Sequence, residues 1–509
     1  MQNIKRRDFL KAMGVGGAAI ALSGFDLSIG KLQKHQKPNI LFIMADDLGK
    51  EWISCYGAEG IETPNIDKLA AGGMRFENVY CMPQCTPTRA TLLTGQYPYN
   101  NGWVNHWDVP RWGAGCHFDW NHNTTFAKVM KTAGYKTAAA GKWQVNDFRV
   151  TPDAMEKHGF DDWCMWTGYE TGVDASAERY WDAYLNTREG SKTYEGQFGE
   201  DVFTDFLIDF MKKNKDEPMM MYYPMALPHP PLTTTPNEPD VEGKKETMAA
   251  MVRYVDTLAG KLVSAIDDLG IRENTIIIWT TDNGTVKNFR NKMDGREVRG
   301  GKATTFESGI NAPFIVNAPG IVPAGVVSDA LSDFTDLLPT FAELGGAELP
   351  ENWQLDGKSI ASHLVGNSND SEREWIMAMG GHPAKLTERG VEPMLEYRDR
   401  VIRDKQYKLF VGKDRQPEKL IDLHADPDEK IDLLSSADVN VIAAKNKLIA
   451  AAASFPEKDA RPKYDPTPAQ SWDKTPKSMS DFNKAYNPEK PLCPANCILY
   501  IQNGCRFCG

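Results

Sequence analysis

Residues 39–47 read Asn-Ile-Leu-Phe-Ile-Met-Ala-Asp-Asp, so a short run of large apolar side chains ends in two acids. Such a run predicts a strand that is buried on both faces, as the strands of parallel sheets are. Residues 274–283 follow the same pattern, because Asn-Thr-Ile-Ile-Ile-Trp-Thr-Thr precedes Asp282 and Asn283. Ligands of open α/β sheets bind at the carboxyl ends of the strands. The two stretches therefore predict a buried sheet with oxygen-bearing side chains at its ligand-binding edge.

Helical and strand patterns alternate on both sides of these two stretches. The expected helices span residues 64–71, 126–133, 203–213 and 247–269, and the further strands span residues 136–140, 218–226 and 314–317. This alternation predicts an α/β fold in which helices sandwich a mostly parallel sheet. After residue 374, short apolar runs around turns, at 374–379, 400–411 and 419–423, predict a smaller C-terminal antiparallel-sheet subdomain.

We expect four parts along the chain. They are a signal and linker (1–37), the main α/β domain (38–374), the antiparallel-sheet subdomain (375–454) and a Pro-rich tail that ends in four cysteines (455–509). With 509 residues and 41% hydrophobic side chains, the chain can bury a large core, which excludes wholesale disorder. The net charge of −11 argues against a nucleic-acid partner, which would favour a basic surface.

The first residues predict export. Arg6 and Arg7 stand before Asp-Phe-Leu-Lys and a weakly apolar run over residues 12–23, which is the pattern of a Tat-type signal. This run is too short and too poor in large apolar residues to span a membrane as a mature helix, and no later stretch is long and apolar enough. We therefore expect a periplasmic or otherwise exported protein without a transmembrane segment after processing.

The chain has nine cysteines, an odd number. An exported protein permits disulfides, so one cysteine is expected to be unpaired or chemically special while the other eight can pair. The last four are Cys493, Cys497, Cys505 and Cys508. Their spacing is compatible with disulfides, which export favours, and with a zinc site.

The oxygen-bearing residues after the two central strands predict a metal site. Either pair alone, Asp46 with Asp47 or Asp282 with Asn283, is typical of a turn or a helix cap. Both pairs follow buried strands, and four such oxygens would repel one another without a cation. Carboxylate and amide oxygens without Cys or His suit Ca²⁺, or Mg²⁺, rather than a transition metal.

Residues 85–95 read Cys-Thr-Pro-Thr-Arg-Ala-Thr-Leu-Leu-Thr-Gly. This string resembles the signature of the sulfatase family, within the alkaline-phosphatase-like superfamily, which is C-x-P-x-R followed by L-T-G. The resemblance implies that a maturation enzyme oxidises Cys85 to formylglycine, whose gem-diol acts as nucleophile beside the cation and can later expel sulfate by regenerating the aldehyde. It also implies that Arg89 orients the modified side chain. The alternative for Cys85 is a disulfide or a buried thiol, with Cys81 nearby.

Three further residues stand in motifs that resemble those of sulfatases. Lys142 lies in Gly-Lys-Trp, Lys302 lies in Gly-Lys-x4-Glu, and His229 follows the predicted strand 218–226. The resemblance implies that the two lysines neutralise charge on the sulfuryl group and that His229 donates to a sulfate oxygen or protonates the leaving alkoxide. Weaker matches, such as Asp-Leu-Leu-Pro-Thr at 336–340, extend the resemblance over residues 38–435.

One residue departs from the family pattern. Sulfatases commonly have a histidine two residues after the motif lysine, where this chain has Gln144. Glutamine can hydrogen-bond a formylglycine hydroxyl but cannot accept its proton. Three histidines in the loop after the signature, His106, His117 and His122, could substitute for it, but each better fits a structural or substrate-facing role.

Together these features predict an exported sulfatase that uses formylglycine and a divalent cation. Export and four tryptophans, Trp103, Trp107, Trp112 and Trp120, favour a sulfated polysaccharide or oligosaccharide, although the same rings could simply pack their loop. Two alternatives stay open: a phosphonate or phosphodiester hydrolase of the same superfamily, and a glycan-binding relative that has lost turnover. The sequence leaves the sugar, the sulfated position and the oligomeric state undetermined.

Overall fold

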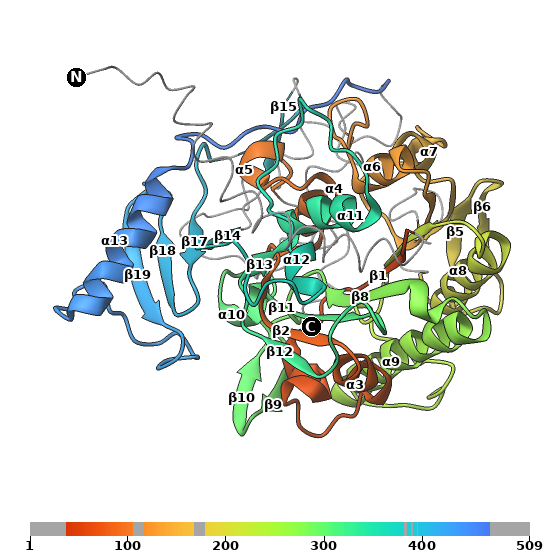
Figure 1. Ribbon diagram of the computed structural model, residues 1–509, viewed down its shortest axis with the longest axis horizontal. Helices are drawn as coiled ribbons and strands as arrows, with labels where there is room; N and C mark the ends of the chain where they lie inside the picture. Colours follow the sequence, from red (N-terminus) through yellow and green to blue (C-terminus); the bar gives the residue numbers. More distant parts are fainter. Residues whose placement is uncertain are drawn as a thin grey trace, which may run out of the picture.

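The computed structural model describes residues 37–104, 117–166, 179–380 and 395–468, together with the backbone of 384–387 and 390–393. A large mixed sheet runs through its centre with helices on both faces, and a smaller antiparallel sheet lies beside it (Figure 1). The predicted fold class is therefore confirmed. The division of the chain at residues 37, 374 and 454 stays a prediction.

The sheet is built around β1 (Asn39–Ala45), which lies between β8 (Thr275–Thr281) and β7 (Met219–Pro224) and runs parallel to both. Beyond β7, β3 (Lys136–Lys142) continues the parallel pairing. The strand order is β12-β2-β11-β8-β1-β7-β3-β4-β5-β6, so five consecutive strands are parallel: the four middle strands from β8 to β3, and β4 beside them. Every residue of β1 and β8 is buried, as the apolar runs predicted.

The remaining strands of this sheet extend it to both sides. They are β2 (Met74–Tyr80), β4 (Asp162–Trp166), β5 (Tyr184–Thr187), β6 (Gly190–Thr193), β11 (Asn311–Asn317), β12 (Val326–Ser328) and β13 (Ser332–Asp333). The short hairpin β9 (Arg290–Met293) and β10 (Arg296–Arg299) forms a separate sheet. β11 pairs antiparallel with β8, which makes the sheet mixed.

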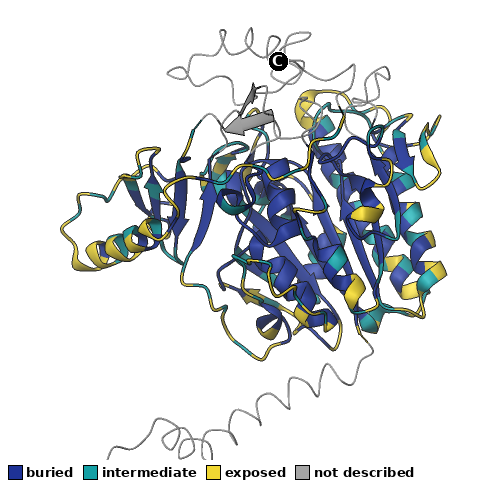
Figure 2. Ribbon diagram, turned by 90° about the horizontal axis from the view of Figure 1, so that it is seen from above, coloured by how far each residue is buried: buried dark blue, intermediate teal, exposed yellow. Residues whose placement is uncertain are grey.

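Two layers of helices cover the sheet. Side chains of Ile40, Phe42 and Met44 pack toward one layer, and Leu41 and Ile43 pack toward the other, as the two-residue period of a strand requires. The first layer contains α4 (Cys85–Thr94), α5 (Pro98–Asn101), α6 (Phe126–Thr132), α7 (Ala154–Lys157), α11 (Leu337–Gly345) and α12 (Ala361–Leu364). The second contains α3 (Pro64–Ala71), α8 (Gly199–Asn214) and α9 (Lys244–Asp268). Figure 2 shows the strands buried between the layers and the exposed residues on the outer surfaces.

The smaller sheet consists of β14 (Ile376–Met379), β17 (Arg400–Arg403), β18 (Tyr407–Val411) and β19 (Pro417–Asp422), all paired antiparallel. Helix α13 (Val439–Ala453) packs on it, and β15 (Ala384–Thr387) pairs with β16 (Gly390–Pro393) in a hairpin. Its apolar core continues into Tyr80 and Met82, at the end of β2. The small sheet is thus packed against the strand that leads into Cys85.

Sequence reasoning missed several of these elements, among them β2 and α13. β2 has the sequence Met-Arg-Phe-Glu-Asn-Val-Tyr, whose alternation is broken by polar residues, and it is only partly buried. Helix α13 does carry a start signal, because the Asp438 side chain accepts hydrogen bonds from the backbone N–H groups of Asn440 and Val441. Residues 455–468 form neither helix nor strand, but Phe455 is buried and the Ala460 N–H donates to the Tyr99 carbonyl.

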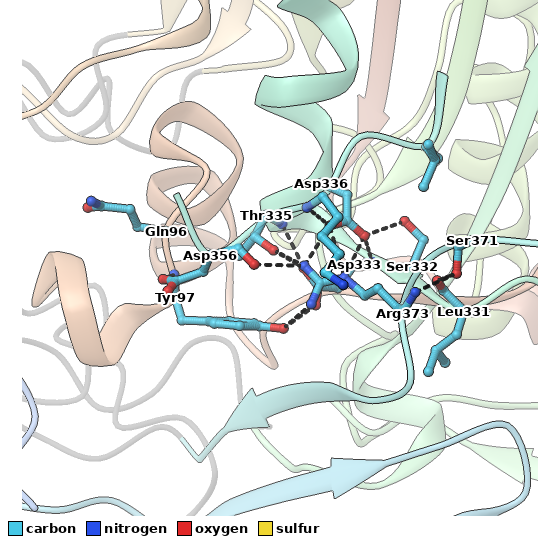
Figure 3. A network of polar contacts seen from close by, with 12 residues as sticks. Gln96, Tyr97, Leu331, Ser332, Asp333, Thr335, Asp336, Asp356, Ser371 and Arg373 are labelled. Atoms are coloured by element: carbon cyan, nitrogen blue, oxygen red, sulfur yellow. Dashed lines mark hydrogen bonds and ion pairs between the residues drawn. The ribbon is translucent and has the colours of Figure 1, made fainter. Parts of the chain in front are cut away.

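A buried ion network fixes the start of α11 against the loop that follows α4 (Figure 3). The Arg373 guanidinium donates to the Asp336 carboxylate from Nε at 2.9 and 2.8 Å and lies 3.5 Å from Asp333. Its Nη2 also donates to Thr335 Oγ1 at 2.6 Å, and its Nη1 donates to Tyr97 Oη at 3.3 Å. One arginine thus neutralises two buried acids and connects three segments of the chain.

Arg373→Leu is expected to lower the free energy of unfolding by about 3–5 kcal/mol, because it leaves the buried Asp333 and Asp336 without their counter-charge. Urea denaturation of the wild-type protein and the variant measures this difference in the free energy of unfolding. The matched control is Arg290→Leu, which breaks the exposed pair with Glu297 and is expected to cost less than about 1 kcal/mol. Equal losses in the two variants would contradict the role given to this network.

Candidate active site

The four middle strands bring the predicted site residues to one edge of the sheet. Asp46 follows β1, Asp282 follows β8, Lys142 ends β3, and His229 lies five residues beyond the end of β7. The strands run parallel, so their carboxyl ends meet at the same edge. Side chains that are far apart in the sequence therefore converge because of the topology.

Backbone hydrogen bonds continue past the strand ends and fix the acids. The Asp282 N–H donates to the Ala45 carbonyl at 3.0 Å, and the Asp46 N–H donates to the Leu227 carbonyl at 2.8 Å. Asp47 has a φ of 63°, a left-handed conformation that aspartate tolerates better than most residues. Its N–H donates to Asp282 Oδ1 at 3.1 Å, so the two acidic loops hold each other.

Cys85 is the first residue of α4, and Arg89 stands one helical turn later. Both side chains are buried, and the Cys85 thiol lies with Asp46 and Asp282 in a group whose ligand atoms are within 4.8 Å of one another. Arg89 Nη2 donates to Asp282 Oδ2 at 2.9 Å, and its Nη1 donates to the Lys142 carbonyl at 2.9 Å. Thr88 Oγ1 donates to the Asp282 carbonyl at 2.7 Å, so the helix start is joined to the end of β8.

Two lysines and a histidine complete the cluster. Lys142 Nζ forms an ion pair with Asp46, and Lys302 Nζ donates to Asp47 Oδ2 at 2.6 Å. Gly141 allows the approach of β3 to β7, because it has a φ of 126° and a Cβ atom there would overlap the Pro224 carbonyl oxygen. Each lysine of the two Gly-Lys motifs therefore contacts one of the two acids after β1.

The hydrogen bonds of His229 fix which ring nitrogen faces the cluster. His229 Nδ1 lies 2.6 Å from the Pro230 carbonyl oxygen, and a carbonyl only accepts, so Nδ1 carries the hydrogen of that bond. His229 Nε2 lies 3.5 Å from Asp47 Oδ2. The nitrogen that is directed at the cluster is therefore Nε2.

The buried charges shift one another's pKa values. Burial by itself would raise the pKa of Asp46, but the nearby charges of Lys142 and His229 together outweigh it. The pKa of Asp46 is therefore well below its usual value. Burial raises the pKa of Asp47. Burial, and to a smaller extent the negative charge of Asp46, raises the pKa of Asp282 to about 7. Burial and then the Lys302 charge hold the pKa of His229 well below its usual value. Repulsion from the Asp46 charge therefore adds to burial in disfavouring the charged forms of Asp47 and Asp282.

The oxygen atoms that stay unpartnered fit a divalent cation. Asp46 Oδ1 and Asn283 Oδ1 are buried, and neither has a hydrogen-bond partner. Asn283 Nδ2 donates to Asp47 Oδ1 at 2.8 Å and to the Gly284 carbonyl at 3.0 Å, which leaves the amide oxygen free to act as a ligand. An amide oxygen and several carboxylates form the donor set that Ca²⁺ and Mg²⁺ prefer. A bound cation would also offset the repulsion between the neighbouring carboxylates.

Gln144 lies two residues beyond the end of β3, with a φ of 64° and a buried Oε1 that has no hydrogen-bond partner. A left-handed glutamine with an unpartnered amide oxygen is strained, as residues at functional sites often are. Of the histidines considered as substitutes, His122 lies 3.3 Å from Asp465 Oδ1, and His117 lies 3.8 Å from Asp119 Oδ2. His106 lies outside the described residues.

Of the four tryptophans that were considered as sugar-stacking residues, the structure describes Trp103 and Trp120. Trp103 is fully buried and packs against Phe118 at 5.5 Å between ring centroids, so it belongs to the core and does not face a substrate. Trp120 is partly buried, and Lys157 Nζ lies 4.3 Å from its ring centroid. Trp107 and Trp112 lie outside the described residues.

The expected cysteine pairing is wrong for the cysteines that the structure describes. Cys55, Cys81, Cys85 and Cys164 are all free, so an unpaired state does not single out Cys85. Cys81 instead donates from Sγ to the Ile310 carbonyl at 3.3 Å. Cys81 and Cys164 are buried in the apolar packing on the two faces of the sheet, whereas Cys55 is only partly buried. The other five cysteines lie outside the described residues.

Sequence reasoning also missed the residues that hold the site loops. Thr285 Oγ1 accepts from the Gly49 N–H at 2.8 Å and so joins the loop after β8 to the loop after β1. Glu51 lies buried next to this bond, and burial raises its pKa to about 7. Thr285 stands two residues after Asn283, but nothing in its sequence context distinguishes it from an ordinary loop threonine.

The chain matches known families over most of its length. A family model described as Sulfatase matches residues 38–347, and one described as N-sulphoglucosamine sulphohydrolase, C-terminal, matches residues 301–452. A model of the TAT (twin-arginine translocation) pathway signal sequence matches residues 3–23. This signal confirms the predicted export. Within the described residues, no helix is long and apolar enough to cross a membrane.

Individual relatives agree with the family models. The chain is 31% identical to N-acetylgalactosamine-6-sulfatase of Canis lupus familiaris over 361 residues, which cover 66% of this chain and 68% of the relative. It is 31% identical to arylsulfatase A of Homo sapiens over 388 residues, which cover 70% of this chain and 72% of the relative. The crystal structure of Ps i-CgsB is similar with a TM-score of 0.70 and 27% identity, covering 89% of this chain and 99% of that chain.

The converging Cys85, acids and lysines thus stand in a chain whose family model, relatives and fold all agree. The chain belongs to the sulfatase family, and it is a sulfatase.

Proposed function

We propose that this exported sulfatase releases sulfate from a sulfated polysaccharide or oligosaccharide, using a formylglycine formed from Cys85 and a divalent cation. The single observation that carries the mechanism is the meeting of Cys85 with Asp46 and Asp282, whose ligand atoms lie within 4.8 Å of one another. A maturation enzyme in the host has to oxidise Cys85 before the site can work. The hydrated formylglycine would supply the nucleophilic oxygen for attack on sulfur.

Four side chains would hold the cation, together with the modified residue 85. They are Asp46, Asp47, Asp282 and Asn283, whose two unpartnered oxygens were described above. Calcium is our first choice and magnesium the second, since the donors are all oxygen atoms. The bound cation would polarise the nucleophile and a sulfate oxygen as a Lewis acid. Arg89, fixed on Asp282, would then orient residue 85.

The two lysines are placed to stabilise negative charge. Lys142 and Lys302 now neutralise Asp46 and Asp47, respectively. A cation shared by the same carboxylates would leave both ammonium groups available to the sulfuryl oxygens. Preorganised charges of this kind stabilise a transition state because they need no reorganisation during the reaction.

His229 would protonate the leaving group. Its Nδ1–H is occupied by the Pro230 carbonyl, so Nε2 has to carry the proton that is transferred, and the ring is then cationic. Burial and the Lys302 charge lower the pKa of the free ring, so the negative charge of the bound sulfate ester would have to favour this protonated form. As the bond between sulfur and the ester oxygen breaks, that oxygen takes the proton from Nε2 and leaves as an alcohol. Gln144 would hydrogen-bond a hydroxyl through Oε1, and it would not act as the base that a histidine provides in many relatives.

The glycan substrate is supported by export and by a solved relative. Ps i-CgsB, 27% identical to this chain, has been crystallised in complex with k-i-k-neocarrahexaose. The twin-arginine signal would place this enzyme outside the cytoplasm, where polysaccharides are met.

Cys85→Ala is expected to lower kcat on 4-nitrophenyl sulfate and on sulfated oligosaccharides by about 10³-fold or more, because the nucleophile is lost. Sulfate release is the measurement, on protein made with its maturation enzyme. The control is Cys164→Ala, which removes another buried thiol away from the cluster and is expected to retain activity.

Two outcomes of this assay would contradict the proposal. Faster hydrolysis of an aryl phosphonate monoester than of the matching aryl sulfate would favour a phosphonate or phosphodiester hydrolase. Glycan binding by the wild-type protein without sulfate release from any ester would favour an inactive glycan-binding relative.

Chelation is expected to lower the melting temperature, because Asp46, Asp47 and Asp282 would be left buried without their cation. A cation present at about 100 times its Kd would stabilise the fold by about 2.7 kcal/mol. Differential scanning fluorimetry with EGTA, EDTA and added Ca²⁺ or Mg²⁺ measures the shift. The same titration of Asp282→Asn should show a smaller response, whereas identical melting temperatures with and without chelator would rule out the cation site.

A further inference from the structure

The turn over residues 225–230 carries His229 but has little regular pairing to hold it. Strand β7 ends at Pro224, and the last ladder-like bonds are Met225 N–H to the Met44 carbonyl and Asp46 N–H to the Leu227 carbonyl. From there to His229 the backbone leaves the sheet. The direction of the His229 ring therefore depends on side chains that hold this turn.

Glu200 binds the N–H groups of the turn. It lies in the first turn of α8 and is fully buried. Its Oε1 accepts from the Ala226 N–H at 2.6 Å and from the Leu227 N–H at 2.9 Å, and its Oε2 accepts from the Tyr223 hydroxyl at 2.6 Å. One carboxylate thus satisfies two consecutive backbone donors of a segment that no strand pairs.

Two residues that precede α8 bind the carbonyl groups of the same turn. The Tyr180 hydroxyl lies 2.7 Å from the Ala226 carbonyl oxygen and 2.6 Å from that of His229. The Arg179 guanidinium donates to the Pro230 carbonyl, which also accepts the Nδ1–H of His229. Glu200, Tyr180 and Arg179 form what we call the turn clamp, and all three are buried.

We propose that Glu200 is a positioning residue for His229, which it serves by fixing the turn from which the ring projects. The proposal rests on the function proposed above, in which His229 Nε2 protonates the leaving group. The three donors that converge on Glu200 compensate for burying its carboxylate. Burial still raises the pKa of Glu200 to about 7, so an apolar residue would be the cheaper choice for packing alone.

The clamp matters for chemistry because proton transfer depends on geometry. A general acid has to stand within hydrogen-bond reach of the oxygen it protonates, and a displacement of about 1 Å can cost about 100-fold in rate. Without Glu200, the N–H groups of Ala226 and Leu227 lose their acceptor, and the turn is free to move. Nε2 would then miss the leaving oxygen, while the nucleophile and the lysines, which stand on other segments of the chain, would stay in place.

The test uses aryl sulfates of graded leaving-group acidity, from 4-nitrophenyl to 4-methoxyphenyl sulfate. A good leaving group departs without a proton, and a poor one needs the acid. Glu200→Ala is expected to lower kcat on 4-methoxyphenyl sulfate by about 100-fold but on 4-nitrophenyl sulfate by less than about 3-fold. His229→Ala should show the same selective loss, and adding Glu200→Ala to it should cause no further selective loss.

Rescue and a second clamp variant strengthen the test. Glu200→Gln keeps an acceptor oxygen for the Ala226 and Leu227 N–H groups, so most of the lost rate should return. Tyr180→Phe removes the hydroxyl at the Ala226 and His229 carbonyls and should give a smaller loss with the same selectivity. This variant keeps the proposal testable if Glu200→Ala does not fold.

The matched control is Asp256→Ala. Asp256 on α9 is also buried, and its Oδ1 accepts from the Asn65 N–H at 2.9 Å and from the Ile66 N–H at 2.8 Å. Its loss should lower the melting temperature without changing the ratio of rates on the two esters.

Two results would overturn the proposal, and they distinguish a failure of the Glu200 role from a failure of the proposed function of His229. If Glu200→Ala lowers both rates equally, as a destabilised enzyme would, whereas His229→Ala is selective, then Glu200 is merely structural and the proposed function stands. If His229→Ala itself is not selective, then the acid role of His229 fails and the positioning role falls with it.

Discussion

The burial of three carboxylates at the ends of two central strands is the constraint on which the rest of this site depends. Asp46, Asp47 and Asp282 are inaccessible to solvent, and the parallel topology brings them together. An unpaired buried charge costs several kcal/mol, so the fold surrounds the acids with cations. Arg89 comes from α4, Lys142 from the end of β3, and Lys302 from a loop. Even so, two oxygens stay unpartnered, and the proposed cation would complete the set.

The smaller sheet is connected to this cluster through the Lys302 loop. That loop runs into α10 (Glu307–Ile310), where Glu307 accepts from the Tyr80 hydroxyl at 2.6 Å and pairs with Lys408 of β18 at 3.0 Å. Ala303 N–H donates to the Pro83 carbonyl at 2.7 Å, two residues before Cys85. The same short segment thus contacts the small sheet, the nucleophile loop and Asp47.

Much of this arrangement could be predicted from the sequence because local patterns carried it. The apolar runs placed β1 and β8 to within a residue, and the strand ends placed Asp46 and Asp282 at one edge. The signature singled out Cys85 and Arg89, which the structure places one turn apart on α4. The rest depends on tertiary contacts: Glu200 meets Ala226 across 26 residues, and Trp103 is buried by Phe118, neither of which leaves a periodic signal. The four free cysteines contradict the expectation, drawn only from the odd number of cysteines, that a single cysteine is unpaired.

The most direct test of the account is the mass of the peptide that carries residue 85, from protein made in its own host. The account predicts the mass of formylglycine at this position, since the acids, the lysines and Arg89 all converge on a residue that would be a poor nucleophile as a buried thiol. A peptide with unmodified cysteine, from protein that nevertheless releases sulfate from esters at full rate, would contradict it.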